Sequence, residues 1–315
     1  MIDNITMLKK SLSEDEKTNI INSSRLVSNS LNGLTYYDNR STKNFTGGLF
    51  IQIDTRNKLK ISGSVQKYHS HLESGRLTNF ETFTMDQAKG TFKKLIVNTG
   101  VNPNDIEVTF FEVGINLKFD IDVKTVLDKV HSIGKTEKPF FIEPKFKDGR
   151  QITTGTHRDF RVHFKMYDKI FEMKDSRKPV ANFKHHILRI ETVHRRVEKL
   201  QLNQLIDSEY LQVIQNDFFT QWNGLNFYND IEAPKGTQRS KIDLVRNIVH
   251  NGKNIVFMDY KSQYENKALT KRQFYAVRDF LKSWELLRSD FTIKKSAIVP
   301  FWDLAYSIEK QLIMN

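Results

Sequence analysis

Arg161-Val-His-Phe-Lys-Met-Tyr-Asp-Lys169 is the stretch of sequence that decides the fold, because its side chains alternate in character. Val162, Phe164 and Met166 would share one face of an extended strand, since successive side chains of a strand point to opposite faces. The other face would carry Arg161, His163, Lys165, Tyr167 and Lys169. We therefore expect a strand that buries its apolar face and offers water a basic face with a single phenol.

The phenol in this basic setting supports two interpretations. Cations near Tyr167 would favour its phenolate and would also attract a phosphodiester, so Tyr167 could act as a nucleophile toward phosphate. Alternatively, the strand is an ordinary basic surface and Tyr167 is an ordinary exposed side chain. The strand alone does not distinguish these two interpretations.

The composition indicates a folded, basic protein. The chain has 315 residues, is 38% hydrophobic and contains 23 Phe, which is enough for a core and is typical of about two domains. Its net charge of +12 favours a polyanionic partner, most commonly nucleic acid, although a ribosomal protein or a binder of anionic membrane would also be basic.

The absence of cysteine and of targeting signals indicates the cellular compartment of the protein. The chain has no cysteine, which excludes disulfides, cysteine zinc sites and cysteine nucleophiles and fits the cytoplasm. The first residues lack the apolar region of a signal peptide, and no stretch approaches the ~20 apolar residues that span a bilayer. We therefore expect a cytoplasmic protein without a membrane partner.

The order of the elements predicts an α+β fold, with a central, mainly antiparallel sheet flanked by helices and a basic helical region at the C-terminal end. We expect a polar, mostly loop-like lead-in over residues 1–45 and an α+β domain over residues 46–225. Residues 226–315 would form the helical region, which either binds DNA or packs on the first domain as a solvated surface. Strands are expected at 49–53, 59–65, 108–119 and 186–193, and helices at 85–97, 123–133, 208–222, 240–250 and 271–287.

Two further strand-like stretches carry polar residues on one face. Glu112, Gly114 and Asn116 alternate with apolar residues in 111–117, and Arg189 and Glu191 do so in 188–192. If these strands pair with the basic strand and turn their apolar faces to one core, the polar residues converge on the opposite face. The residues that would meet there are Glu112, Asn116, Glu191, Tyr167 and Lys169.

Carboxylate and amide oxygens at such a face are the ligands that Mg²⁺ or Mn²⁺ prefers, and a metal there could polarise a phosphodiester. Glu172, just after the basic strand, could add a ligand. Alternatively, Glu112 and Glu191 balance the basic strand as cross-strand ion pairs.

Five short motifs occur in a fixed order along the chain. They are Ile61-Ser-Gly-Ser-Val-Gln-Lys-Tyr68, Asn79-Phe80 with Phe83-Thr84, Phe111-Glu-Val-Gly-Ile-Asn116, Lys165-Met-Tyr-Asp-Lys169 and Leu188-Arg-Ile-Glu191. This series resembles the replication initiators of filamentous and related single-stranded phages, of the gene II/X type. Over its last two motifs it is also similar to initiators of staphylococcal-type rolling-circle plasmids. The resemblance covers roughly residues 50–225 and depends on the ordered set, because each motif is short.

The resemblance implies a rolling-circle replication initiator that nicks and rejoins one DNA strand at an origin. It implies that Tyr167 is the nucleophile that forms a 5′-phosphotyrosine, with Lys169 as its companion. It further implies that Glu112 and Glu191, with Glu172 as a third candidate, hold Mg²⁺ or Mn²⁺. A site-specific recombinase or relaxase would share this chemistry and differ mainly in its substrate.

The expected partner is origin DNA, single-stranded or supercoiled, together with host helicase and polymerase in the cytoplasm of a bacterial host cell. We expect DNA contacts from Arg161, His163, Lys165, Arg189, Lys60 and Lys67. The alternative is a non-catalytic, sequence-specific DNA-binding replication regulator, which would need the basic faces but not Tyr167 with its carboxylates.

His69-Ser-His71 resembles the metal-binding histidine pair of another class of rolling-circle nucleases. In that class the pair lies on a strand, where residues i and i+2 face the same way. Here the middle residue is Ser and the surroundings, residues 68–83, have the pattern of a loop. We therefore expect unliganded loop histidines near the DNA.

Overall fold

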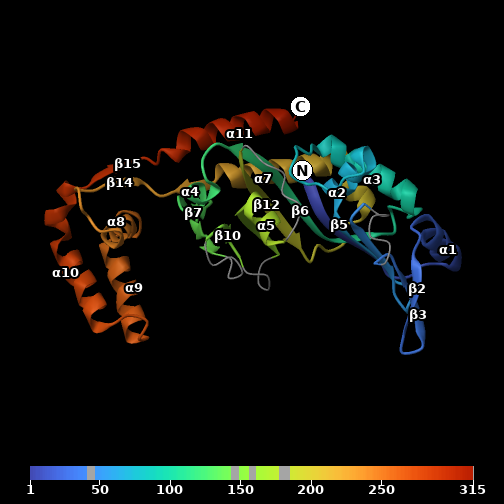
Figure 1. Ribbon diagram of the computed structural model, residues 1–315, viewed down its shortest axis with the longest axis horizontal. Coiled ribbons are helices and arrows are strands. Elements are labelled where there is room, and N and C mark those ends of the chain that lie inside the picture. The colour runs from blue at the N-terminus through green and yellow to red at the C-terminus, as the bar shows by residue number, and fades with distance from the viewer. Residues whose placement is uncertain (41–46, 143–148, 156–160, 177–184, 315) are drawn as a thin grey trace. The chain divides into compact units, whose positions relative to one another are not determined.

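The computed structural model describes residues 1–40, 47–142, 149–155, 161–176 and 185–314 (Figure 1). The chain forms two compact units. The first unit contains Met1–Asp128, Ser132–Leu225 and Leu304–Asn315, and the second contains Lys129–His131 and Asn226–Asp303.

The first unit is built around a ten-stranded sheet with the order β2-β3-β4-β5-β1-β6-β12-β11-β10-β9. In this order the strands are β2 (Val27–Leu31), β3 (Leu34–Asp38), β4 (Leu49–Ile53), β5 (Leu59–Ser64), β1 (Ile2–Lys9), β6 (Glu107–Phe119), β12 (His186–Arg195), β11 (Val162–Asp168), β10 (Gln151–Thr153) and β9 (Phe141–Ile142). Neighbouring strands pair antiparallel, and helices flank the sheet (Figure 1). The predicted α+β class with a central antiparallel sheet is thus confirmed.

The helices of the first unit begin and end where the sequence provides caps. Thr84 accepts a hydrogen bond from the Gln87 amide at the start of α3, and Gly100 ends that helix with a left-handed φ of 71°. The helices are α1 (Glu14–Ser23), α2 (Val65–Ser74), α3 (Met85–Thr99), α4 (Val123–Leu127), α5 (Lys169–Asp175), α6 (Leu202–Leu205) and α7 (Ser208–Asn223). A short ladder pairs β7 (Val130–Ile133) with β8 (Lys138–Pro139).

Helix α7 covers the apolar face of the sheet. The Phe218 ring on α7 stacks on Phe164 of β11 with 6.4 Å between ring centroids, and Trp222 of α7 is fully buried. Burial of such large aromatic side chains contributes about 1.5–3 kcal/mol each. The helix predicted at 208–222 and the strand predicted from the basic stretch are both confirmed.

Three local expectations are wrong. Residues 1–45 are not mostly loop, because they form β1, α1, β2 and β3, and β1 lies in the middle of the sheet between β5 and β6. Residues 68–83 are not all loop either, since α2 continues to Ser74. The helix expected at 123–133 ends at Leu127, and β7 follows it.

The second unit is mainly helical. It contains α8 (Arg239–Asn251), α9 (Lys253–Glu265) and α10 (Lys271–Leu287), with an antiparallel pair of strands, β14 (Asp230–Glu232) and β15 (Thr292–Lys294). Its core consists of Leu244, Val245, Ile248, Val256, Leu281 and Trp284. The remaining elements of the chain are β13 (Leu225–Phe227), the short 3-10 helix η1 (Arg288–Asp290) and α11 (Ile298–Met314).

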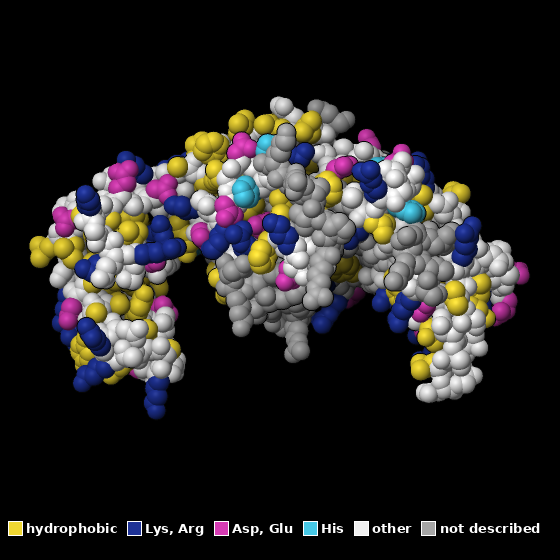
Figure 2. Space-filling model, in the orientation of Figure 1, with side chains coloured by type: hydrophobic (Ala, Val, Ile, Leu, Met, Phe, Trp, Pro, Cys, Tyr) yellow, Lys and Arg dark blue, Asp and Glu magenta, His cyan; other side chains and the backbone are white. Residues whose placement is uncertain are grey.

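The helices predicted at 240–250 and 271–287 are confirmed as α8 and α10. Figure 2 shows Lys and Arg side chains spread over the visible face of this helical unit. Among the described residues, none of the helices combines the length and the apolar character that crossing a membrane requires.

Candidate active site

The register of three neighbouring strands brings the predicted polar residues to one face. Glu191 on β12 pairs with Gly114 on β6 and with Lys165 on β11. Arg189 pairs with Asn116 on β6 and with Tyr167 on β11. Directly paired residues lie on the same face of a sheet. We call this face the polar face; it is formed by Glu112, Gly114, Asn116, Arg189, Glu191, Lys165 and Tyr167.

Gly114 makes room for the central carboxylate of this face. A Cβ at this position would lie 2.6 Å from Cγ of Glu191 and 2.6 Å from the backbone oxygen of Ile190. The glycine in the motif Glu112-Val-Gly114 is therefore required by the packing of Glu191 against β6.

Tyr167, Glu191 and Glu112 form one connected cluster. The Tyr167 hydroxyl donates a hydrogen bond to Oε1 of Glu191 over 3.1 Å. The Lys165 ammonium lies 2.5 Å from Oε2 of Glu191 and 3.2 Å from Oε1 of Glu112, so that one cation joins the two carboxylates. The phenol is thus in direct contact with Glu191, and Lys165 connects Glu191 to Glu112.

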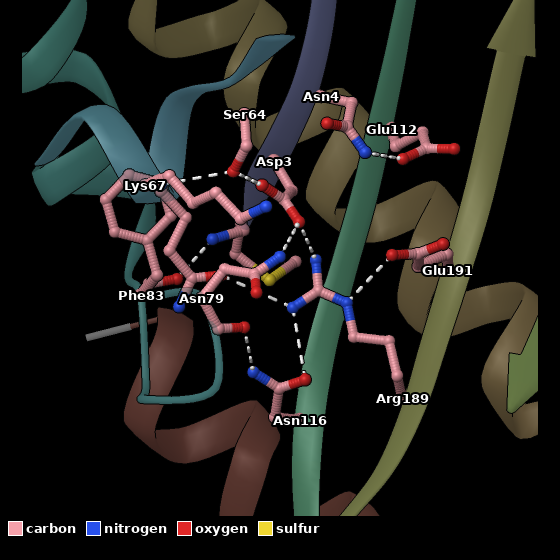
Figure 3. A network of polar contacts seen from close by, with 12 residues as sticks. Asp3, Asn4, Ser64, Lys67, Asn79, Phe83, Glu112, Asn116, Arg189 and Glu191 are labelled. Carbon is pink, nitrogen blue, oxygen red and sulfur yellow. Dashed lines mark hydrogen bonds and ion pairs between the residues drawn. The ribbon is translucent and has the colours of Figure 1, made fainter. Parts of the chain in front are cut away.

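Arg189 links this cluster to the beginning of the chain. Its Nε donates to Oε1 of Glu191 over 2.8 Å, and its Nη2 donates to Oδ2 of Asp3 over 2.8 Å (Figure 3). Asn116 accepts from the same guanidinium over 3.2 Å. Asp3 is itself held by Ser64, so β1 and β5 support the guanidinium from the opposite side (Figure 3).

The charges on this face shift one another's pKa. Burial opposes ionisation of Glu191, but Lys165 and Arg189 outweigh it and lower the Glu191 pKa to about 2. Burial and the charge of Glu191 raise the pKa of Glu112. Lys165 keeps its proton, because the two carboxylates outweigh its burial and raise its pKa.

Tyr167 departs from the sequence prediction. Burial, and then the charge of Glu191, raise its pKa well above the ordinary value of 10, so the phenolate is disfavoured. The prediction of a basic face open to water is also wrong, since Tyr167 is 8% exposed and Arg189 is 1% exposed. The cations do not act on the phenol alone, because carboxylates from neighbouring strands balance them.

Lys169 and Glu172 lie at the edge of the cluster. Lys169 begins α5, is 2% exposed, and places its ammonium 2.9 Å from Glu172 and 5.8 Å from the centroid of the Tyr167 ring. Glu172 is thus the ion-pair partner of Lys169, and its charge adds to those that raise the pKa of Tyr167.

The residues predicted to contact DNA divide into two groups. His163 is buried, and Lys165 and Arg189 are engaged with the carboxylates described above. Lys60 and Arg161 are exposed, with Arg161 pairing with Glu198 at 3.0 Å, and Lys67 is half-buried. Of the six predicted contacts, only Lys60 and Arg161 are exposed, whereas Lys67 and Lys165 are half-buried.

The histidines of His69-Ser-His71 do not form a ligand pair of the strand type. They lie on α2, where residues i and i+2 point in different directions. Nδ1 of His69 lies 3.1 Å from the Thr91 hydroxyl, whereas His71 lines a cavity of about 270 Å³ beside Tyr68. Histidines with closely spaced rings occur instead in the second unit, where the centroids of His131 and His250 are 3.3 Å apart.

Sequence reasoning missed Asp3 and Asn4, which hold Arg189 and Glu112 from β1. The sequence signal for a strand at residues 2–9 was weak, because the apolar residues Ile2, Ile5 and Met7 do not alternate strictly. The register of β1 against β6 is irregular between Ile2 and Ile5. No protein-family model matches the chain, and no curated protein matches it.

Proposed function

We propose that this protein is a rolling-circle replication initiator that nicks and rejoins one DNA strand at an origin, with Tyr167 as its nucleophile. One observation carries the proposal. The Tyr167 hydroxyl lies 3.1 Å from Glu191, and Glu191 shares the Lys165 ammonium with Glu112. The ordered motifs that resemble phage and plasmid initiators supply the reaction class.

In the proposed reaction, Oη of Tyr167 attacks the scissile phosphorus while the bond from phosphorus to the 3′ oxygen breaks. The products are a 5′-phosphotyrosine and a free 3′-OH. The phenolic proton passes along the hydrogen bond to Glu191 and is then taken up by the leaving 3′ oxygen, so that no net proton is gained or lost. Attack of a 3′-OH on the phosphotyrosine reverses these bond changes and rejoins the strand. Because Tyr167 is 8% exposed, the scissile phosphate requires a local opening of the protein over the polar face.

Glu112 and Glu191 would hold the Mg²⁺ or Mn²⁺ of this reaction. Their donor set fits a hard cation, since it consists of carboxylate oxygens that already enclose one positive charge, the Lys165 ammonium. Burial first, and then the charge of Glu191, raise the pKa of Glu112, so a cation beside Glu112 would favour its charged form. The chemistry such an ion supplies is polarisation of the phosphodiester.

Covalent capture tests the proposal. Purified protein is incubated with Mn²⁺ and a labelled supercoiled plasmid that carries the DNA flanking the gene, and adducts are mapped by mass spectrometry. We expect one adduct, at Tyr167, and we expect Tyr167→Phe to lose nicking and adduct while retaining DNA binding. Tyr210→Phe, which alters a partly buried tyrosine on α7 away from the polar face, is the control and should nick normally. Full nicking by Tyr167→Phe would refute the assignment.

A second candidate function is a non-catalytic DNA-binding regulator. This function is favoured by the ion pairs on the polar face, where Lys165 and Arg189 pair with Glu112, Glu191 and Asp3. These charges neutralise one another inside the protein and need no substrate or metal ion. Such a protein would bind the same plasmid with a steep salt dependence. It would form no adduct with or without Mn²⁺, and this outcome separates the two functions.

A further inference from the structure

Two histidines distant in sequence meet within the second unit. His131 lies on β7 and His250 lies in the last turn of α8. The centroids of their rings are 3.3 Å apart with an angle of 49° between the planes. The two imidazoles are therefore in direct contact with each other.

The backbone around the pair is well supported. The Tyr228 amide donates to the carbonyl oxygen of Lys129 over 2.8 Å, and the Lys129 ammonium pairs with Asp230. The Tyr228 ring meets His131 edge-on, with centroids 4.8 Å apart, and meets His250 at 5.7 Å. The two imidazoles are thus held together by contacts within the second unit rather than by chance on an exposed surface.

We propose that His131 and His250 bind one borderline divalent metal ion, of which Zn²⁺ is the representative. Neutral imidazole nitrogen is a preferred ligand of Zn²⁺, Ni²⁺ and Cu²⁺. A ligand nitrogen of each ring lies within 4.8 Å of one on the other. Two nitrogens at about 2.0–2.1 Å from one Zn²⁺ are at most about 4.2 Å apart, so the ion would hold the two nitrogens inside this separation. Two protein ligands leave coordination positions for water or a further group.

This site is chemically different from the one at Glu112 and Glu191, and its existence does not depend on the proposed nicking activity. The carboxylates favour Mg²⁺ or Mn²⁺, whereas the imidazoles favour softer ions. The competing explanation is an aromatic cluster of His131, His250 and Tyr228 that only stabilises the fold. Such a cluster would not respond to Zn²⁺.

The first experiment uses the unaltered full chain. Protein with ¹³C at Cε1 of histidine is titrated with ZnCl₂ and followed by NMR. The chain has nine histidines, and we expect the resonances of His131 and His250 to shift together at one equivalent of Zn²⁺. Unchanged signals for both would overturn the proposal, and so would shifts confined to other histidines such as His69 and His71.

The second experiment uses calorimetric titration of Zn²⁺ into variants. His131→Ala and His250→Ala should each weaken binding by at least about 10-fold, and the double variant should lose little more, because both residues hold the same ion. His185→Ala, which alters an exposed histidine paired with Asp120, is the matched control and should bind as the wild type does. Wild-type affinity in either single variant contradicts the site.

Discussion

The two glutamates of the polar face should respond in opposite ways to neutralisation. Glu191→Gln removes a carboxylate whose pKa is lowered from 4.5 to about 2 by Lys165 and Arg189, against the effect of burial. Since one pKa unit corresponds to about 1.4 kcal/mol, Glu191→Gln should lower the free energy of unfolding at pH 7 by about 3 kcal/mol. Glu112→Gln removes a carboxylate whose pKa is raised by burial, so this variant should be no less stable than the wild type.

The pH dependence follows from the same shifts. The unfolded form of Glu191 binds a proton near pH 4.5, whereas the folded form binds it near pH 2. Its stabilising contribution is therefore fully present above pH 4.5 and is lost as the pH falls toward 2. Glu191→Gln should remove this loss. The contribution of Glu112 to stability has the opposite sign. Because its pKa is raised, the folded state binds the proton at a higher pH than the unfolded state does, so protonation of Glu112 stabilises the folded state as the pH falls.

Urea unfolding measures these differences in the free energy of unfolding, provided that the fluorescence of the first unit is separated from that of the second. Trp222 belongs to the first unit, whereas Trp284 and Trp302 belong to the second. In a background with Trp284→Phe and Trp302→Phe, fluorescence therefore reports on Trp222 alone. Equal destabilisation by the two glutamine variants, or wild-type stability of Glu191→Gln, would contradict the charge distribution described above.

Three further variants test two residues of the polar face and one glycine outside it. Arg189→Met should lower the free energy of unfolding by about 3–5 kcal/mol in urea, because it leaves Asp3 and Glu191 buried without their shared cation. Gly47→Ala should cost at least about 1 kcal/mol in the same assay, since Gly47 has a φ of 58° and a Cβ would lie 2.7 Å from the Tyr68 ring. Lys165→Met should tighten Mn²⁺ binding, measured calorimetrically, because it removes the ammonium between the two carboxylates; unchanged or weaker binding would argue against a metal at that position.

Strand alternation predicted the shared face because it depends only on local geometry. Once a stretch is extended, its period of two assigns each side chain to a face, and the apolar residues decide which face enters the core. For β6, β11 and β12 this was sufficient to bring together Tyr167, Glu112 and Glu191. Helices with clear caps, such as α3 after Thr84, were predictable for the same reason.

Strand alternation could not predict the central position of β1 in the sheet. Its residues Asp3 and Asn4 are consecutive polar side chains, which interrupt the alternation, and its pairing with β6 joins segments about 100 residues apart. Strand order is set by such distant pairings, which a local pattern does not contain. Without β1 the sequence lacked the partner of Arg189, and that residue was interpreted as a surface cation.

The prediction that cations favour the phenolate of Tyr167 failed for a related reason. A strand displays the charges of one chain segment, but the pKa of a buried group depends on the net charge and solvation of the whole cluster. Lys165 and Arg189 approach the phenol from β11 and β12. Glu191, however, accepts a hydrogen bond from the Tyr167 hydroxyl, and the charge of Glu191 is balanced by both cations. The phenol therefore experiences a paired network with little water. Under the proposed function, activation of Tyr167 would require a change in that balance, either through a phosphodiester that engages the cations or through a divalent cation that Glu112 and Glu191 would hold.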